Sequence, residues 1–152
     1  GTWANRVATD LALNETSLLQ ACKNIRSNWV DERGLKILGR PKPNGLMVPV
    51  NLMDVASRIT KTELRPDTAN NDINALREME GGVTGYMVID YLTSTTAWFV
   101  LTQNDGLIFF ERDSYETDMW VDNVTHNLLV SAYQRATPAV NDYRTSWGSF
   151  PS

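Results

Sequence analysis

The order of helix-like and strand-like segments limits what this chain can fold into. Helical periodicity occupies residues 13–34 and 51–64, one short apolar run lies between them at 46–50, and β-branched and aromatic runs recur between residues 85 and 147. Strands that follow one another without intervening helices do not form the regular βαβ repeats of an all-parallel sheet. We therefore expect an α+β domain with a mixed or antiparallel sheet flanked by helices.

The segment 13–34 gives the clearest helix. Residues at helical spacing lie on one mostly apolar face: Leu18, Leu19, Cys22, Ile25, Arg26 and Trp29. Ser17 followed by Gln20 predicts a capping box near its start. For the second helix, 51–64, Asn51 is the expected N-cap residue.

Strands are predicted where apolar runs meet turn residues. Residues 40–45 contain two prolines and predict an extended loop before the strand at 46–50. A second strand is expected at 85–93. Two further apolar runs flank the sequence Asn-Asp-Gly at 104–106, and Asp-Gly between such runs predicts a β-hairpin.

The last third of the chain is predicted to contain a loop and a long strand. The acidic segment 111–123 is expected to be a solvated loop because charged residues dominate it. Residues 126–147 predict one long strand that is interrupted or bent at Pro138.

Size and charge fit one ordinary domain. The chain has 152 residues, of which 42% are apolar and 21% charged, so a substantial core is expected. Its apolar runs are too short to span a membrane. The formal net charge of −4 excludes bulk coating of nucleic acid, since phosphate binding needs a concentrated positive field.

Catalysis needs a set of positioned groups, and the sequence offers few of them. The single histidine, His126, lies in a predicted strand, and no G-x-S-x-G motif accompanies it. The single cysteine, Cys22, excludes an intrachain disulfide and lies on an apolar helix face. Four nitrogen and sulfur ligands for zinc are not available. We therefore predict no enzyme activity, no catalytic residue, no metal site and no cofactor.

The acidic segment and the tryptophans leave alternatives open. One is a calcium site, although the EF-hand pattern is absent, and its candidate ligands are Glu111, Asp113, Glu116, Asp118 and Asp122. Another is a hydrolase in which Asp113 and Asp118 share a cleft as general acid and base. The alternative function is a non-catalytic carbohydrate- or ligand-binding module, in which several of the five tryptophans would share one face.

Residues 67–79, with the sequence DTANNDINALREM, contain too many Asn and Asp residues to build a core. Such short side chains, which donate and accept hydrogen bonds, suit helix caps and contacts to the backbone of a neighbouring subunit. Asn71 or Asp72 would then cap a short helix at 73–79. Binding of a ligand or metal is the remaining alternative.

An ordered set of motifs spanning most of the chain resembles the major capsid proteins of tailed bacteriophages. The corresponding segments are Leu46 to Pro49, Thr68 to Asn74, Tyr91 to Val100, Gly106 to Arg112, and Tyr133 to Trp147. One departure is Gln134, where such chains often carry a glutamate. An ionic contact built on that carboxylate is therefore not expected here.

The resemblance implies a fold and a domain assignment. The fold is the axial domain of the Hong Kong 97-like capsid, and residues 1–152 would form a single domain of this type. The last strand, about residues 126–150, would return to the peripheral domain. The N-terminal arm, extended loop and spine helix of the family are not expected within this chain.

The resemblance also implies a role. The chain would be a structural major capsid protein that self-assembles into the icosahedral phage head and encloses double-stranded DNA without sequence-specific binding. Its partners would be copies of itself in hexamers and pentamers, together with scaffold, portal or decoration proteins, and no membrane. It would reside in the virion after assembly in the host cytoplasm. The candidate subunit contacts are Asn70, Asn71, Asp72, Asn74, Arg77, Trp120, Arg135 and Arg144.

Overall fold

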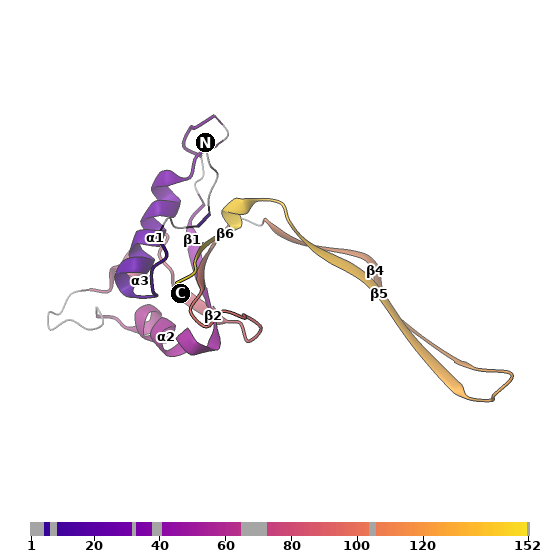
Figure 1. Ribbon diagram of the computed structural model, residues 1–152. Helices are drawn as coiled ribbons and strands as arrows, with labels where there is room; N and C mark the ends of the chain where they lie inside the picture. The colour runs from indigo at the N-terminus through magenta and orange to yellow at the C-terminus, as the bar shows by residue number, and fades with distance from the viewer. Residues whose placement is uncertain are drawn as a thin grey trace. The chain divides into compact units, whose positions relative to one another are not determined.

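The chain divides into two units, which we call the body and the ribbon. The body consists of Gly1–Asn104 and Tyr143–Ser152, and the ribbon consists of Asp105–Asp142. The computed structural model describes residues 5–6, 9–31, 33–37, 41–64, 73–103 and 106–151 (Figure 1).

The helices of the body are α1 (Glu15–Asn28), η1 (Val50–Leu52), α2 (Met53–Lys61), α3 (Ala75–Glu78) and η2 (Tyr143–Thr145). Neither α1 nor α2 begins at the N-cap residue predicted from the sequence. The side chain of Asn14 caps α1 by accepting from Ser17 N at 2.7 Å, so the capping box predicted at Ser17 and Gln20 is wrong. Asn51 lies inside η1, and α2 begins after Leu52 without a side-chain cap, so the predicted cap at Asn51 is also wrong.

A four-stranded mixed sheet forms the centre of the body. Its strands are β1 (Pro43–Val48), β2 (Gly85–Val88), β3 (Trp98–Thr102) and β6 (Ser146–Ser149), in the order β2-β1-β3-β6. β1 pairs parallel with β2, whereas the pairs β1–β3 and β3–β6 are antiparallel. The predicted α+β class with a mixed sheet is confirmed. The loop predicted at 40–45 is shorter than expected, because β1 already begins at Pro43.

The core lies between the helices and one face of this sheet (Figure 1). Strand residues on that face are Leu46, Val48, Trp98, Val100 and Trp147. Helix residues that pack against them are Leu18, Ala21, Cys22, Ile25, Ala56, Ile59 and Leu76. The rings of Trp98 and Trp147 meet with centroids 5.4 Å apart, so two of the largest side chains fill the centre of the body.

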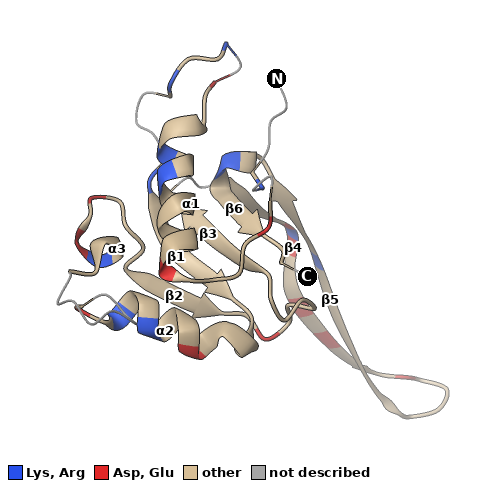
Figure 2. Ribbon diagram, turned by 60° about the vertical axis from the view of Figure 1, so that its left-hand side comes forward, with Lys and Arg blue, Asp and Glu red and all other residues tan. Residues whose placement is uncertain are grey.

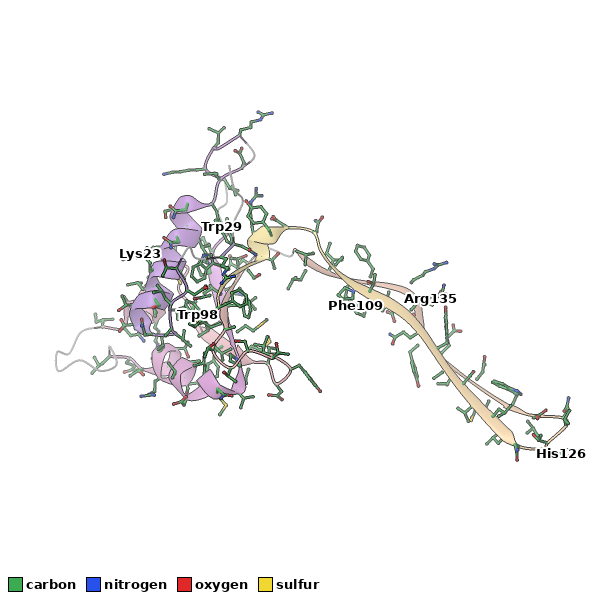
Figure 3. The ribbon with its side chains drawn as sticks, viewed as in Figure 1. Lys23, Trp29, Trp98, Phe109, His126 and Arg135 are labelled. Carbon is green, nitrogen blue, oxygen red and sulfur yellow. The ribbon has the colours of Figure 1, made fainter. Side chains whose placement is uncertain are left out.

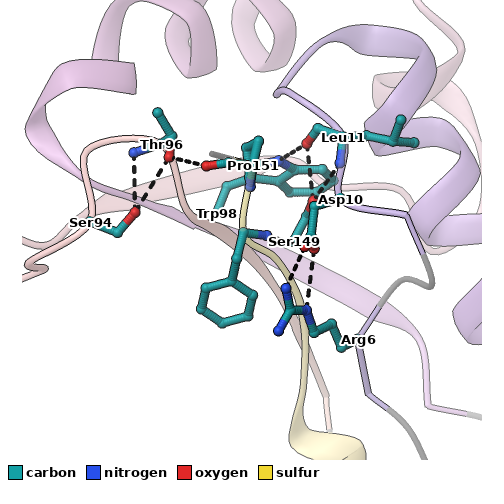
Figure 4. Close-up of polar contacts among 9 residues, drawn as sticks. Arg6, Asp10, Leu11, Ser94, Thr96, Trp98, Ser149 and Pro151 are labelled. Atoms are coloured by element: carbon teal, nitrogen blue, oxygen red, sulfur yellow. Dashed lines mark hydrogen bonds and ion pairs between the residues drawn. The ribbon is translucent and has the colours of Figure 1, made fainter.

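Polar contacts fasten the segment before α1 to this core (Figure 4). The carbonyl oxygen of Leu11 accepts from Trp98 Nε1 at 2.9 Å and from Ser149 Oγ at 3.0 Å. Arg6 forms an ion pair with Asp10, and together with a backbone amide it holds the pKa of that carboxyl below its ordinary value. Among the described residues, no buried side-chain nitrogen or oxygen lacks a hydrogen-bond partner.

The ribbon is a two-stranded antiparallel sheet made of β4 (Leu107–Val121) and β5 (Leu128–Val140). The loop predicted at 111–123 is therefore wrong, because most of that segment lies in β4. Charged residues mislead here because a strand with solvent on both sides can carry them at many positions.

The predicted hairpin is also wrong, because β3 pairs with β1 and β6, whereas β4 pairs with β5. The single strand predicted at 126–147 is divided into β5, η2 and β6. His126 lies in the turn between β4 and β5 rather than in a strand. β3 thus pairs with strands distant in sequence, whereas β4 pairs with the next strand along the chain.

Candidate assembly interface

The ribbon has two faces of different character. β5 runs without interruption, so alternate residues of β5 and their partners in β4 define each face. The face that contains Val130 and its partner Met119 is here called the apolar face. Its apolar members are Leu107, Phe109, Met119, Val121, Leu128, Val130, Ala132, Ala136, Pro138 and Val140.

The apolar face is uncovered among the described residues of the chain. Met119 is 72% exposed, Phe109 65% and Val130 64%. Near the base of the ribbon, Leu107, Phe109, Pro138 and Val140 line an apolar groove. The largest apolar patch on a typical monomer covers roughly 300–600 Å² and is often functional, and larger patches mark interaction sites.

The opposite face, here called the acidic face, carries carboxylates along its middle. Asp113, Glu116 and Asp118 lie opposite Arg135, Tyr133 and Ser131, respectively. The Tyr133 hydroxyl donates to Asp113 at 3.3 Å, and the Arg135 guanidinium lies 5.6 Å from the centre of the Tyr133 ring. Figure 3 marks Arg135 and Phe109 along the ribbon.

The two candidate contacts on the ribbon, Trp120 and Arg135, both lie on its acidic face. Trp120 is opposite Leu129 and about half exposed, so this face ends in an apolar pair near the turn. Both side chains are accessible to a neighbouring subunit, and their role as contacts remains a prediction.

The turn at the end of the ribbon is held by Asp122. Its carboxylate accepts from Val124 N at 3.1 Å and from Thr125 Oγ1 at 2.6 Å, and these bonds lower its pKa. The backbone of Asp122 exchanges hydrogen bonds with His126 and Asn127. His126, marked in Figure 3, has a φ of 57°, which an L-residue adopts at some cost.

The body offers a second apolar surface, which is partly exposed, on the sheet face opposite the helices. Register places Met87, Met47 and Phe99 in one row across three strands, and Gly85, Gly45 and Leu101 in the next. We call these six residues the open sheet face. Met87 is 52% exposed, and a Cβ added at Gly45 or Gly85 would meet nothing within 4 Å.

The candidate contacts in the Asn-rich segment have different outcomes. Asn70, Asn71 and Asp72 lie outside the described residues. Asn74 is fully buried, and its side chain donates to Ile59 O at 2.7 Å and Thr62 O at 2.9 Å. It also caps α3 in place of the predicted Asn71 or Asp72. Because its amide is used within the chain, Asn74 cannot serve as a side-chain contact for a neighbour.

Of the two candidate arginines of the body, Arg77 is exposed and Arg144 is partly buried. Arg77 Nη1 lies 3.6 Å from Glu63 Oε1 and donates to Lys61 O at 3.5 Å. Arg144 Nη2 donates to Val30 O at 3.4 Å, so it links the segment after α1 to η2. Both arginines therefore also have roles within the chain.

The described residues do not bring together the side chains that the calcium, hydrolase and ligand-binding alternatives require. No group of three or more His, Cys, Asp or Glu side chains converges among them. Asp113 and Asp118 lie on the exposed ribbon face rather than in a cleft. Trp29, Trp98 and Trp147 are buried in the core, so they do not form a stacking platform. No described helix is long and apolar enough to cross a bilayer.

Sequence reasoning missed the apolar face of the ribbon. Its signal is the alternation of Met119 with Val121 and of Leu128 with Val130 on either side of a short turn. The neighbouring carboxylates concealed this signal, because they lie at intervening positions of the same strand.

Comparison with known proteins finds a distant structural likeness. No family model matches the chain, and no curated protein matches it. A solved structure of a phage-related protein from Bordetella bronchiseptica is similar with 12% sequence identity and a TM-score of 0.49. The match covers 88% of this chain and 49% of that protein, so the chain spans about half the length of this structural neighbour.

Proposed function

We propose that the chain is a structural subunit that assembles with copies of itself into the head of a tailed bacteriophage. The observation that carries this proposal is the uncovered apolar face of the ribbon. An isolated two-stranded hairpin is marginally stable in water, so this ribbon needs a surface that covers it. The ordered motifs that resemble those of major capsid proteins indicate that the assembly is a phage head. In a symmetric shell, each copy meets neighbours whose surfaces can cover its ribbon.

In this role the chain is an axial-type capsid domain without enzyme activity. Its partners are copies of itself in hexamers and pentamers, with scaffold, portal or decoration proteins, and it is located in the virion. The head encloses double-stranded DNA without sequence-specific binding. The net charge of −4 is compatible with that, because attraction to phosphate requires clustered positive charge.

Paired substitutions on the two faces of the ribbon test this function. Val130→Lys places a charge on the apolar face, and Ser131→Lys places the same charge on the neighbouring exposed position of the acidic face. Sedimentation and electron microscopy of the purified chain should show five- and six-fold rings or shells for the wild type and for Ser131→Lys. Val130→Lys should remain unassembled, since docking would bury an unpaired charge.

Far-ultraviolet circular dichroism of each variant checks that the fold is retained. The proposal is contradicted if the wild-type chain stays monomeric at concentrations at which burial of the ribbon would drive association. Equal assembly of the two lysine variants contradicts the part assigned to the apolar face.

A further inference from the structure

We propose that the apolar face of the ribbon docks on the open sheet face of a second copy of this chain. This inference rests on the proposed self-assembly and names the two surfaces that meet. It makes the contact heterologous, so that each copy gives its ribbon to one neighbour and receives a ribbon from another. Contacts of this kind close into rings when the rotation between copies allows it.

The open sheet face has the character of a receiving surface. Met87, Met47 and Phe99 form a continuous apolar row, and Phe150 packs edge-on against Phe99 with ring centroids 5.3 Å apart. A sheet with one face on the core normally presents polar side chains on the other face. Here the second face presents methionine and phenylalanine instead, which indicates that another layer covers it.

The glycine pair beside this row leaves room for that layer. Gly45 and Gly85 are neighbours in register, and the space above both is open. Gly148 on the same face is different, because a Cβ there would come within 3.0 Å of the Phe99 ring. Packing among the described residues therefore explains Gly148, whereas these residues leave the space above Gly45 and Gly85 unfilled.

The shapes of the two surfaces are compatible. Two sheets pack face to face at about 10 Å with interdigitated side chains, and both surfaces are twisted β-structure. β4 has 15 residues, which at about 3.3 Å per residue gives a length of about 50 Å. A ribbon of this length can reach the body of a neighbouring copy.

Charge favours this pairing over a contact between two ribbons. The ribbon carries seven acidic and two basic residues, a formal charge of −5, whereas the body carries eleven acidic and twelve basic residues, a charge of +1. Figure 2 shows lysine and arginine on α1 and α2. A two-fold contact between ribbons would bring two strongly acidic elements together, which costs free energy. Docking on a body avoids that repulsion.

Cross-linking between variants that each carry one added cysteine tests the docking directly. The native thiol, Cys22, is fully buried, so new exposed cysteines can be labelled selectively. Met87→Cys places a thiol on the open sheet face, and Val130→Cys places one on the apolar face of the ribbon. The two variants are mixed and treated with a short bismaleimide, so that any covalent product joins two different copies.

Matched controls use exposed positions away from each surface. Leu35→Cys is an exposed position of the body outside the sheet, and Ser131→Cys lies on the acidic face of the ribbon. We expect the mixture of Met87→Cys and Val130→Cys to give several-fold more mixed dimer than either mixture that contains a control. Circular dichroism verifies that each variant is folded.

The outcomes separate this inference from the proposed function. Rings in electron microscopy without the mixed dimer would overturn the docking and leave self-assembly standing. Efficient dimer formation by Val130→Cys alone would also overturn it, because that product indicates ribbon-to-ribbon pairing. The absence of both rings and cross-links would contradict self-assembly as well as the docking.

Discussion

At the scale of single residues, Asn74 has an unusual concentration of internal hydrogen bonds. Its side chain satisfies the carbonyl oxygens of Ile59 and Thr62 at the end of α2, and its Oδ1 accepts from Leu76 N at 3.2 Å. Its backbone N–H donates to Glu63 O at 3.0 Å. One buried side chain thus joins the end of α2 to the start of α3.

We predict that Asn74→Ala lowers the free energy of unfolding by about 2–4 kcal/mol, because it leaves several buried backbone groups without partners at about 1–3 kcal/mol each. The free energy of unfolding is measured by urea denaturation. Asn51→Ala is the control, since Asn51 is exposed and caps no helix, and it should change the value by less than about 0.5 kcal/mol. Equal effects of the two substitutions would contradict the assignment.

The role of Asn74 illustrates what the sequence can and cannot predict at this scale. Asparagine near a helix start correctly indicates a cap in this segment, but Asn70, Asn71 and Asn74 all satisfy that local pattern. Asn74 is distinguished from the other two by its place beside the carboxyl end of α2, where its amide donates to Ile59 O and Thr62 O. That placement depends on tertiary packing. The burial of its amide was therefore not predictable from the spacing.

At the scale of elements, local periodicity predicted the helices and tertiary pairing decided the strands. α1 was predictable because its apolar stripe lies within one segment, although its N-cap is Asn14 rather than the predicted capping box. The partners of β3 and β4 were not, because the Asp-Gly turn signal acts over a few residues, whereas β3 gains two neighbours in the body sheet. The apolar face of the ribbon was missed because carboxylates lie at intervening positions of β4.

The ribbon turn yields a prediction at the same scale. Asp122→Ala removes the acceptor for Val124 N and Thr125 Oγ1, so we expect lower hydrogen-exchange protection at the amides of Asp122 and His126. Nuclear magnetic resonance measures that protection, with Asn123→Ala as a neighbouring control. Unchanged protection in Asp122→Ala would show that backbone pairing alone holds the turn.

The turn should also respond to acid. Hydrogen bonds lower the pKa of Asp122 in the folded chain, so its contribution to stability is complete above the ordinary aspartate pKa of about 3.9 and is lost as pH falls through the lower folded value. Protection of the Asp122 and His126 amides, corrected for intrinsic exchange, should fall in that range. Asp122→Ala should show no such decline.

At the scale of the whole molecule, Cys22 reports on the integrity of the body. Burial raises the pKa of its thiol to about 12, so the thiolate that reacts with disulfide reagents is scarce in the folded chain. We predict that labelling of Cys22 at pH 8 proceeds only as fast as the body unfolds. The labelling rate should rise with urea in parallel with the unfolded fraction measured by circular dichroism.

The raised pKa of the Cys22 thiol also predicts the direction in which the stability of the body changes with pH. The folded state keeps the proton that the unfolded state releases near pH 8.5, so this contribution to stability is complete below that pH and falls as pH rises towards about 12. Cys22→Ala should reduce the alkaline loss of stability in urea titrations. Rapid labelling of the native chain at pH 8 would contradict the buried, protonated state.

The register shifts in the ribbon affect whether the chain can form fibres by strand addition. Between Glu111 and Asp113, and again between Asp113 and Glu116, the ladder of β4 and β5 is irregular. A long strand whose outer amides and carbonyls are free can template the addition of further strands, as in amyloid. Bulges and carboxylates along β4 interrupt such a template, so the chain can keep an exposed ribbon without forming fibres.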